Sequence, residues 1–167
     1  LIIQILIMTY CYQTSDELAE NLSIEFLDYV SKGNKSGQAI NIALSGGNTP
    51  RAFFERIAMN QLKPKTPVPW QKIHLFWVDE RCVPPDHADS NYGMTRSALI
   101  QKIELNENNI HRIRGENNPG PESQRYSEEV KLHVPRKEGI PVFDLIYLGV
   151  GDDGHTASIF PDQISLL

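Results

Sequence analysis

Apolar residues recur along this chain at two spacings, which together predict strands that alternate with helices. Short runs with few charges predict strands at 39–44, 73–78 and 143–148. Spacings of three and four residues predict helices after Thr14, from Thr49, and over 91–101 and 121–133. Strands that alternate with helices are joined by crossover connections, so we expect a mainly parallel sheet.

Two of the helix starts carry capping signals. Thr14-Ser15-Asp16-Glu17 has the form of a capping box, with Thr14 as N-cap and Glu17 three residues later. Thr49-Pro50 predicts a second start, with Thr49 as N-cap and Pro50 at the first helical position, where a missing N–H costs little.

The two ends of the sequence depart from this pattern. Leu1–Met8 reads LIIQILIM, which is far below the roughly 18 residues of a membrane span and lacks a basic leader. We expect a buried first strand there. The sequence does not start with Met, and it stops at Leu167 soon after a glycine-rich loop. We therefore expect a single domain over 1–167 that lacks its C-terminal elements.

Composition narrows the class of protein. With 40% hydrophobic and 22% charged residues among 167, the chain has the composition of one globular domain. Its net charge of −5 argues against a nucleic-acid partner, because binding a phosphate backbone needs a basic surface. Cys11 and Cys82 fit no metal or redox spacing, so two reduced thiols are the simpler interpretation. We expect a cytoplasmic protein without a membrane anchor.

The turn after the strand at 39–44 has the features of a phosphate-binding loop. Its small residues are Ser45, Gly46, Gly47, Asn48 and Thr49. Such residues expose backbone N–H groups, and the start of a helix adds partial positive charge. The lysine and the spacing of a Walker loop are absent from this turn. A plain strand-to-helix turn is the alternative, because this turn type is common in α/β folds.

Charged residues follow the strand at 73–78, and a parallel sheet would place them at the same edge as the first turn. Arg81 can clamp a phosphate through its planar guanidinium group. Asp79 can hold a sugar hydroxyl or take part in proton transfer. A surface salt bridge among neighbouring charges explains these residues equally well.

A glycine-rich segment, Gly149–Pro161, follows the strand at 143–148 and contains His155. Asp153 lies two residues earlier, where a carboxylate can fix the imidazole tautomer and raise its basicity. Gly151 and Gly154 allow a sharp turn and the close approach of a ligand. A structural histidine that closes a turn is the alternative. The G-x-G-x-x-G match within this segment is discounted, because both inner positions before the last glycine are Asp.

The remaining histidines show no sign of a shared site in the sequence. They are His74, His87, His111 and His133, and no pair of them has metal-ligand spacing. We expect no metal site. The G-x-S-x-G nucleophile elbow is also absent, which disfavours a serine hydrolase of the α/β type.

Three sequence blocks taken together carry a family resemblance. They are ALSGGNTP at 43–50, FWVDERCVP with SNYGM at 76–84 and 90–94, and GVGDDGHTASIFP at 149–161. In this order they resemble the glucosamine-6-phosphate isomerase/6-phosphogluconolactonase family. The resemblance implies a three-layer α/β/α sandwich with a mainly parallel, Rossmann-like sheet. It also implies hydrolysis of 6-phospho-D-glucono-1,5-lactone in the pentose phosphate pathway, without a metal or organic cofactor.

The resemblance also assigns roles to the residues named above. The substrate's phosphate would rest on residues 45–49 and pair with Arg81. His155 would activate water as general base, with Asp153 orienting the imidazole. Backbone N–H groups of the loop that holds Gly151 and Gly154 would stabilise the oxyanion. Family members generally continue well past residue 167, and basic residues of that part help to bind the phosphate.

Two other functions stay open from the sequence. The isomerase/deaminase branch of the family has a Glu five residues after the loop histidine, and this chain has Phe160 there. That difference favours the lactonase branch over an amino-sugar phosphate isomerase/deaminase. A non-catalytic sugar-phosphate binder is the alternative from a different class. The sequence leaves the oligomeric state open.

Overall fold

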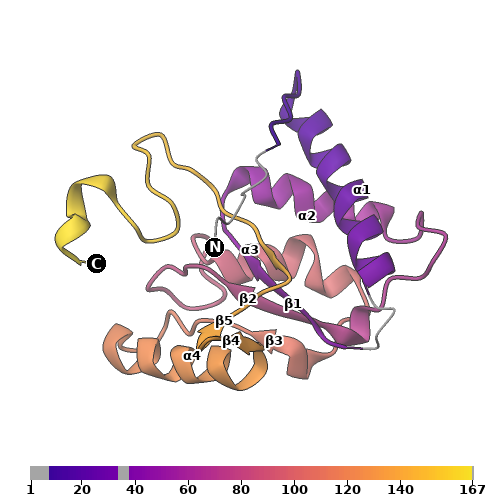
Figure 1. Ribbon diagram of the computed structural model, residues 1–167. Helices are drawn as coiled ribbons and strands as arrows, with labels where there is room; N and C mark the ends of the chain where they lie inside the picture. The colour runs from indigo at the N-terminus through magenta and orange to yellow at the C-terminus, as the bar shows by residue number, and fades with distance from the viewer. Residues whose placement is uncertain (1–7, 34–37, 167) are drawn as a thin grey trace.

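A four-stranded parallel sheet lies at the centre of the protein (Figure 1). The computed structural model describes residues 8–33 and 38–166. The order of the strands across the sheet is β3-β2-β1-β6. Their bounds are Ile40–Leu44 for β1, Ile73–Trp77 for β2, Ile110–His111 for β3 and Leu145–Ile146 for β6. Each neighbouring pair is parallel, which confirms the predicted type of sheet.

Helices cover both faces of this sheet and make three layers. Helices α1 (Ser15–Gly33), α2 (Asn48–Asn60) and α3 (Asn91–Ala98) pack on one face. Helix α4 (Pro119–His133) packs on the other face (Figure 1). A short antiparallel pair, β4 (Arg136–Lys137) and β5 (Ile140–Pro141), follows α4. Short 3-10 helices lie at Trp70–Lys72, Ile100–Lys102, Glu107–Asn109 and Pro161–Leu166. The predicted three-layer α/β/α architecture is confirmed.

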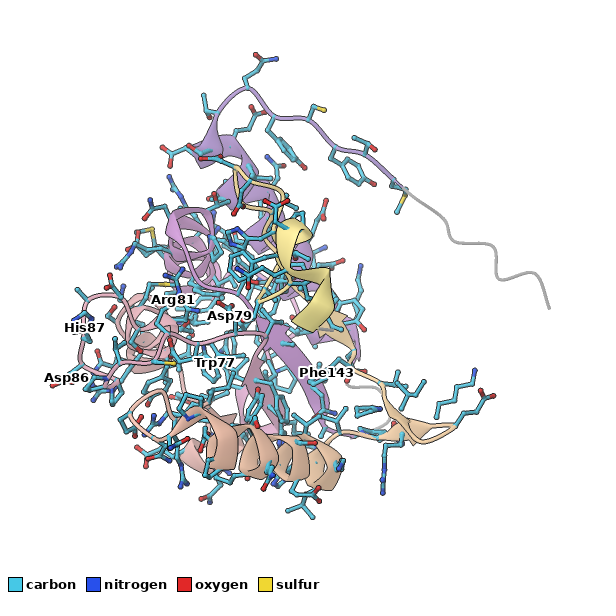
Figure 2. All side chains as sticks on the ribbon, turned by 90° about the vertical axis from the view of Figure 1, so that its left-hand side faces the viewer. Trp77, Asp79, Arg81, Asp86, His87 and Phe143 are labelled. Atoms are coloured by element: carbon cyan, nitrogen blue, oxygen red, sulfur yellow. The ribbon has the colours of Figure 1, made fainter. Side chains whose placement is uncertain are left out.

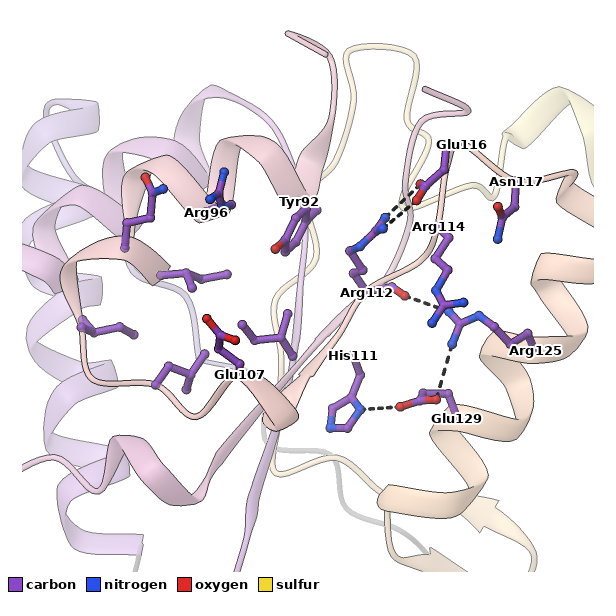
Figure 3. Close-up of a pocket in the computed structure, with 15 residues that line it drawn as sticks. Tyr92, Arg96, Glu107, His111, Arg112, Arg114, Glu116, Asn117, Arg125 and Glu129 are labelled. Carbon is purple, nitrogen blue, oxygen red and sulfur yellow. Dashed lines mark hydrogen bonds and ion pairs between the residues drawn. The ribbon is translucent and has the colours of Figure 1, made fainter. Parts of the chain in front are cut away.

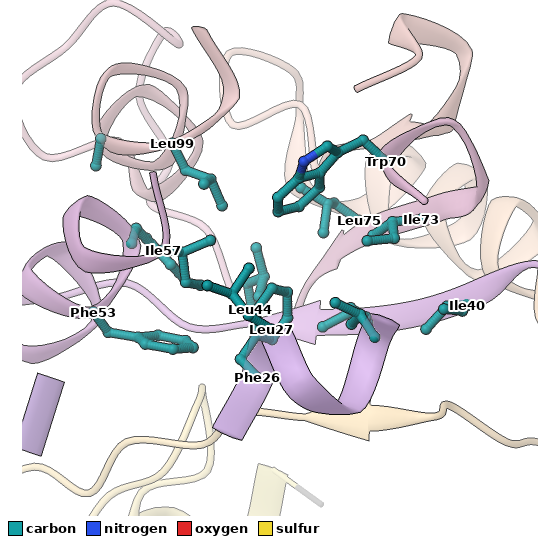
Figure 4. Packing of buried hydrophobic residues seen from close by; sticks show 14 of the residues in the cluster. Phe26, Leu27, Ile40, Leu44, Phe53, Ile57, Trp70, Ile73, Leu75 and Leu99 are labelled. Atoms are coloured by element: carbon teal, nitrogen blue, oxygen red, sulfur yellow. The ribbon is translucent and has the colours of Figure 1, made fainter. Parts of the chain in front are cut away.

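Alternation along β1 and β2 divides the buried side chains between the two faces. Ile42 and Leu75 join the large apolar cluster under α1, α2 and α3 (Figure 4). Ala43 and Phe76 join a smaller cluster under α4. All five residues of β1 are buried, as expected of a strand covered on both faces. This double burial explains why β1 and β2 read as nearly continuous apolar runs.

The predicted strand at 143–148 is much shorter in the structure. Only Leu145 and Ile146 form strand β6, which pairs with β1. On the β1 side, the Asp144 carboxylate accepts a hydrogen bond from the Asn41 N–H at 2.8 Å. Among the described residues, no strand pairs with the other side of β6, and Leu148 is 58% exposed. The apolar run was therefore a poor guide to the length of this edge strand.

The capping predictions have mixed outcomes. At α1 the Thr14 Oγ1 accepts the Glu17 N–H at 3.1 Å, which confirms Thr14 as N-cap. The Glu17 carboxylate reaches back to the N–H of Gln13 at 3.0 Å, one residue before the position that a capping box requires. At α2 the predicted start is wrong by two residues, because the helix begins at Asn48 and its N-cap is Gly47. Gly47 has a φ of 110°, a conformation that favours glycine and gives the chain its turn into the helix.

Other expectations concern the first residues and membrane association. The predicted strand at Leu1–Met8 lies outside the described residues, except for Met8, which is exposed and irregular. Among the helices of the described part, none is long and apolar enough to cross a membrane.

Candidate active site

Three sequence motifs follow strands that end at the carboxyl edge of the sheet. Strands β1, β2 and β6 are parallel neighbours, so the turns that follow them emerge on the same side. The Val78 N–H donates to the Leu44 carbonyl at 2.9 Å and links the ends of β2 and β1. The Ser45 hydroxyl donates to the Tyr147 carbonyl at 2.8 Å and links β1 to the segment after β6. Open α/β sheets bind ligands at such an edge.

The turn after β1 leaves backbone donors free at the start of α2. The helix ladder begins with the Arg51 N–H, which donates to the Gly47 carbonyl at 3.1 Å. No side chain caps this helix, and Asn48 and Thr49 are exposed. Their N–H groups have no partner within the helix. The partial positive charge of the helix start adds to these donors and makes the turn suited to an anion.

Gly46 is required by the close approach of α3. A Cβ placed on Gly46 would overlap the side chain of Asn91, the first residue of α3. Asn91 is 5% exposed, and its Nδ2 donates to the backbone carbonyl of Asp79 at 3.1 Å and to its carboxylate at 3.2 Å. Asn91 thus joins the first turn to the second, a role that the sequence analysis did not assign.

Asp79 lies beyond the end of β2, with Arg81 two residues on (Figure 2). Burial raises the pKa of the Asp79 carboxyl, while the Asn91 hydrogen bond and the charges of Arg81 and protonated His155 oppose that rise. Arg81 and His155 therefore lie close enough to act electrostatically on the same carboxylate. This is the clearest link between the second and third motifs.

Arg81 offers an exposed guanidinium group. Its backbone N–H donates to the neighbouring Glu80 carboxylate at 2.8 Å. Its side chain is exposed, and no carboxylate in the described part of the chain forms an ion pair with it. The alternative interpretation of Arg81 as a partner in a surface salt bridge is wrong for this structure. Its charge is available to an anionic ligand.

Glu80 caps the start of α3, a role that was not predicted from the sequence. Its carboxylate accepts the N–H groups of Asn91 at 2.7 Å and Tyr92 at 2.9 Å. It also accepts the Ser90 hydroxyl at 3.1 Å, and the Ser90 Oγ in turn accepts the Gly93 N–H at 3.0 Å. Ser90 is the N-cap of α3, and Glu80 joins it from ten residues earlier. The loop after β2 is thereby fastened to α3.

His155 is held by its own loop. Its Nδ1 lies 2.5 Å from the Asp153 Oδ1, which also accepts the His155 N–H at 3.2 Å. The hydrogen bond from His155 lowers the pKa of Asp153. The Phe160 ring stacks on the imidazole, with centroids 4.9 Å apart and planes 26° apart. The imidazole is thus fixed through Nδ1 and one ring face, and Nε2 has no partner among the residues that the structure describes.

The N–H groups of Gly151 and Gly154 form hydrogen bonds within the turn that holds His155. The Gly151 N–H donates to the His155 carbonyl at 2.8 Å, and the Gly154 N–H donates to the Gly151 carbonyl at 2.9 Å. Gly154 has a φ of 83°, and a Cβ on Gly151 would overlap the His155 ring. The N–H groups of Gly151 and Gly154 are thus engaged within the turn, and the role of the loop's backbone N–H groups toward an oxyanion stays a prediction.

A cleft of about 860 Å³ lies next to β3, lined by several arginines (Figure 3). Arg112 forms a paired contact with Glu116, at 2.6 and 2.9 Å, and its guanidinium lies 5.3 Å from the Tyr92 ring centre. Arg125 is 2.6 Å from the Glu122 carboxylate. These partners lower the pKa of Glu116 and of Glu122 to about 2 each. Neither β3 nor this cleft was predicted from the sequence.

Three histidines that the sequence analysis considered unremarkable lie together on the sheet face under α4. They are His74 of β2, His111 of β3 and His133 at the end of α4, and a ligand nitrogen of each lies within 4.8 Å of the others. Their sequence separation hides the cluster, because the fold alone brings the three elements together.

Comparison with known proteins identifies the relatives of this chain. The model of the family described as glucosamine-6-phosphate isomerases/6-phosphogluconolactonase matches residues 13–167. The 6-phosphogluconolactonase of Treponema pallidum is 46% identical over 132 residues, which cover 79% of this chain and 54% of that protein. The 6-phosphogluconolactonase of Haemophilus influenzae is 38% identical over 152 residues, which cover 91% of this chain and 61% of that protein.

A solved structure shows the same arrangement of elements. The crystal structure of devB protein matches with a TM-score of 0.81 and 43% identity, covering 91% of this chain and 61% of that one. The chain thus spans between one half and two thirds of the length of these relatives.

Proposed function

This chain belongs to the glucosamine-6-phosphate isomerase/6-phosphogluconolactonase family, and on that premise we propose that it carries a catalytic site for hydrolysis of 6-phospho-D-glucono-1,5-lactone. The product is 6-phospho-D-gluconate, in the pentose phosphate pathway. The observation that supports this proposal most is the position of His155. Its imidazole is held through Nδ1 by Asp153 and lies within electrostatic range of Asp79, at the edge where the first turn leaves α2 uncapped.

The anionic end of the substrate has two complementary partners in this proposal. The free N–H groups of Asn48 and Thr49 point out of the start of α2, where the helix dipole favours a phosphate. The unpaired guanidinium of Arg81 supplies a full positive charge and a planar donor pair. Asp79, held by Asn91, is placed to accept a hydrogen bond from a sugar hydroxyl.

His155 supplies the acid–base chemistry. With Nδ1 hydrogen-bonded to Asp153, Nε2 takes a proton from water as the water oxygen attacks the lactone carbonyl carbon. The tetrahedral intermediate then collapses, the bond from the carbonyl carbon to the ring oxygen breaks, and His155 returns the proton to that oxygen. The Asp153 carboxylate stabilises the imidazolium that forms between the two steps. No metal or organic cofactor takes part.

Phe160 supports the lactonase over the isomerase/deaminase. A glutamate at this position would be needed by the second reaction, and the structure has an apolar ring stacked on His155 instead. The ring shields one face of the imidazole and offers no proton-transfer group. The two relatives described above both carry the name 6-phosphogluconolactonase.

The test is a lactonase assay on His155→Asn and Arg81→Met, with His87→Asn as a matched control in an exposed loop. General acid–base catalysis contributes about 10²–10⁴-fold, so His155→Asn should lose at least about 100-fold in kcat. Arg81→Met should raise KM for the phosphorylated lactone and leave turnover of unphosphorylated gluconolactone unchanged. The control should stay within about twofold of wild type, because the His87 side chain is half exposed and its polar contacts among the described residues are with Asp89 alone.

Three outcomes would contradict the proposal. Activity of His155→Asn within a few-fold of wild type would remove the base assignment. Release of ammonia from glucosamine-6-phosphate would favour the deaminase. Calorimetric binding of 6-phosphogluconate without any turnover of the lactone would identify a binder rather than an enzyme.

A further inference from the structure

The three-histidine cluster is built by strand alternation and helix packing. His74 and Phe76 lie two residues apart in β2 and share the face that α4 covers. The register pairs Phe76 with His111 in β3, and the Phe76 and His111 rings stack with centroids 4.4 Å apart. Helix α4 ends over this point and contributes His133, whose ring centre is 4.2 Å from that of His111.

The contacts within the cluster leave ligand nitrogens facing one another. His74 Nδ1 and His111 Nε2 are 2.9 Å apart, the distance of an N–H···N hydrogen bond, and the two ring planes are only 10° apart. A bound ion would take the place of the proton between these two nitrogens. On its other side, His111 Nδ1 lies 2.7 Å from the Glu129 carboxylate (Figure 3). A carboxylate that takes the Nδ1–H of a histidine leaves Nε2 with a lone pair, which is the arrangement found behind metal-binding imidazoles.

We propose that His74, His111 and His133 form a binding site for a divalent transition-metal ion such as Zn²⁺. Imidazole nitrogen is a preferred ligand of Zn²⁺, and three protein ligands leave a fourth position for water. Glu129 is the supporting carboxylate: it contacts His111 directly and lies 3.5 Å from His133 Nε2.

Binding of an ion would require modest changes in the distances between the ligand nitrogens. Tetrahedral Zn²⁺ with bonds of about 2.0–2.1 Å places its nitrogen ligands about 3.3–3.4 Å apart. The His74–His111 pair must therefore open by about 0.4 Å, and no pair must close by more than about 1.5 Å, since all three nitrogens already lie within 4.8 Å. Changes of this size lie within side-chain rotation.

One buried polar group on the same face as the cluster lacks a hydrogen-bond partner among the described residues. Asn41 is the register partner of His74 in β1 and is 1% exposed, and its side-chain oxygen has no donor among the described residues. A water bound to the metal would be a strong hydrogen-bond donor near the side-chain oxygen of Asn41.

Such an ion would have a structural role. The ligands come from β2, β3 and the last residue of α4, so one ion would fasten the C-terminal end of α4 to two strands of the sheet. His74 is the second residue of β2 and lies away from the carboxyl edge where the catalytic site is proposed. Metal binding is therefore expected to change stability rather than the chemistry at His155.

The experiment measures metal binding to the chain after dialysis against a chelator. Zn²⁺ is titrated calorimetrically, and Co²⁺ is used as a spectroscopic probe whose visible bands report tetrahedral coordination. We expect one equivalent to bind with a rise in Tm. His133→Gln and His74→Gln should weaken this binding by at least about tenfold, and Glu129→Gln should weaken it by about 10–100-fold.

His87→Gln is the matched control, because His87 lies in an exposed loop outside the cluster. It should keep the one-equivalent binding and the Co²⁺ spectrum. His133 is about one third exposed at a helix end, so its variant is expected to fold even where a change at buried His111 does not. Equal affinity of wild type, His133→Gln and His74→Gln would overturn the proposal, as would the absence of a one-equivalent site in folded wild type.

Discussion

The four hydrogen bonds received by Glu80 predict that this carboxylate is a main support of the loop between β2 and α3. Its oxygens accept the N–H groups of Arg81, Asn91 and Tyr92 and the hydroxyl of Ser90. In Glu80→Gln an NH₂ group replaces one carboxylate oxygen, so a hydrogen-bond donor faces the two donor groups that this oxygen accepted. Two of the four bonds are therefore lost, while the size of the side chain is kept.

The magnitude follows from the type of bond. Hydrogen bonds to a charged group contribute about 1.5–3 kcal/mol each. Glu80 is half-buried, so water can replace part of what is lost, and we expect the free energy of unfolding to fall by about 2–3 kcal/mol. For a chain of this size that corresponds to a fall in Tm of about 4–12 °C.

Urea unfolding followed by tryptophan fluorescence measures this change, and amide exchange locates it. The amides of Asn91 and Tyr92 should exchange faster in Glu80→Gln, because their acceptor is weakened. Glu104→Gln is the control, since the exposed Glu104 carboxylate has no partner in the part of the chain described. A loss below about 1 kcal/mol, or unchanged exchange at Asn91 and Tyr92, would refute the reasoning.

Two further predictions concern the α4 face. The Tyr126 hydroxyl accepts the N–H of Trp77 at 2.9 Å and donates to its C=O at 2.8 Å. Tyr126→Phe should therefore lower the free energy of unfolding in urea by about 2–4 kcal/mol, whereas the control Tyr12→Phe should change it little. The low pKa of His74, about 4 against 6.5, means that the unfolded chain takes up the proton first, so stability should fall as pH drops from about 6.5 to about 4. With the ring part-exposed this amounts to about 1–2 kcal/mol, and an equal pH slope in His74→Gln would contradict it.

The sequence predicted the elements that are set by local burial. Strands β1 and β2 were found because both of their faces are covered, which makes the apolar run continuous. Strand β6 was overestimated, since an apolar run says nothing about whether a neighbouring strand exists to pair with it. Strand β3 was missed because it has only two residues, one of which is histidine.

The candidate site was predicted in its parts but not in its connections. The residues of the three turns were named from their chemistry, and the parallel sheet brings those turns to one edge. The bonds that join the turns come from Glu80 and Asn91, which act across ten or more residues and have no short-range pattern. The same reason hid the histidine cluster, whose members belong to three separate elements.

The division of side chains between the two faces of β2 has a consequence for how the chain finds its fold. A slip by one residue would exchange the two sets, turning His74 into the apolar cluster and Leu75 toward α4. Such a mispaired intermediate would bury an imidazole without a partner and would leave a leucine against Glu129 and His133. Short parallel strands have no hairpin to fix their alignment, so this mismatch disfavours the shifted pairing energetically.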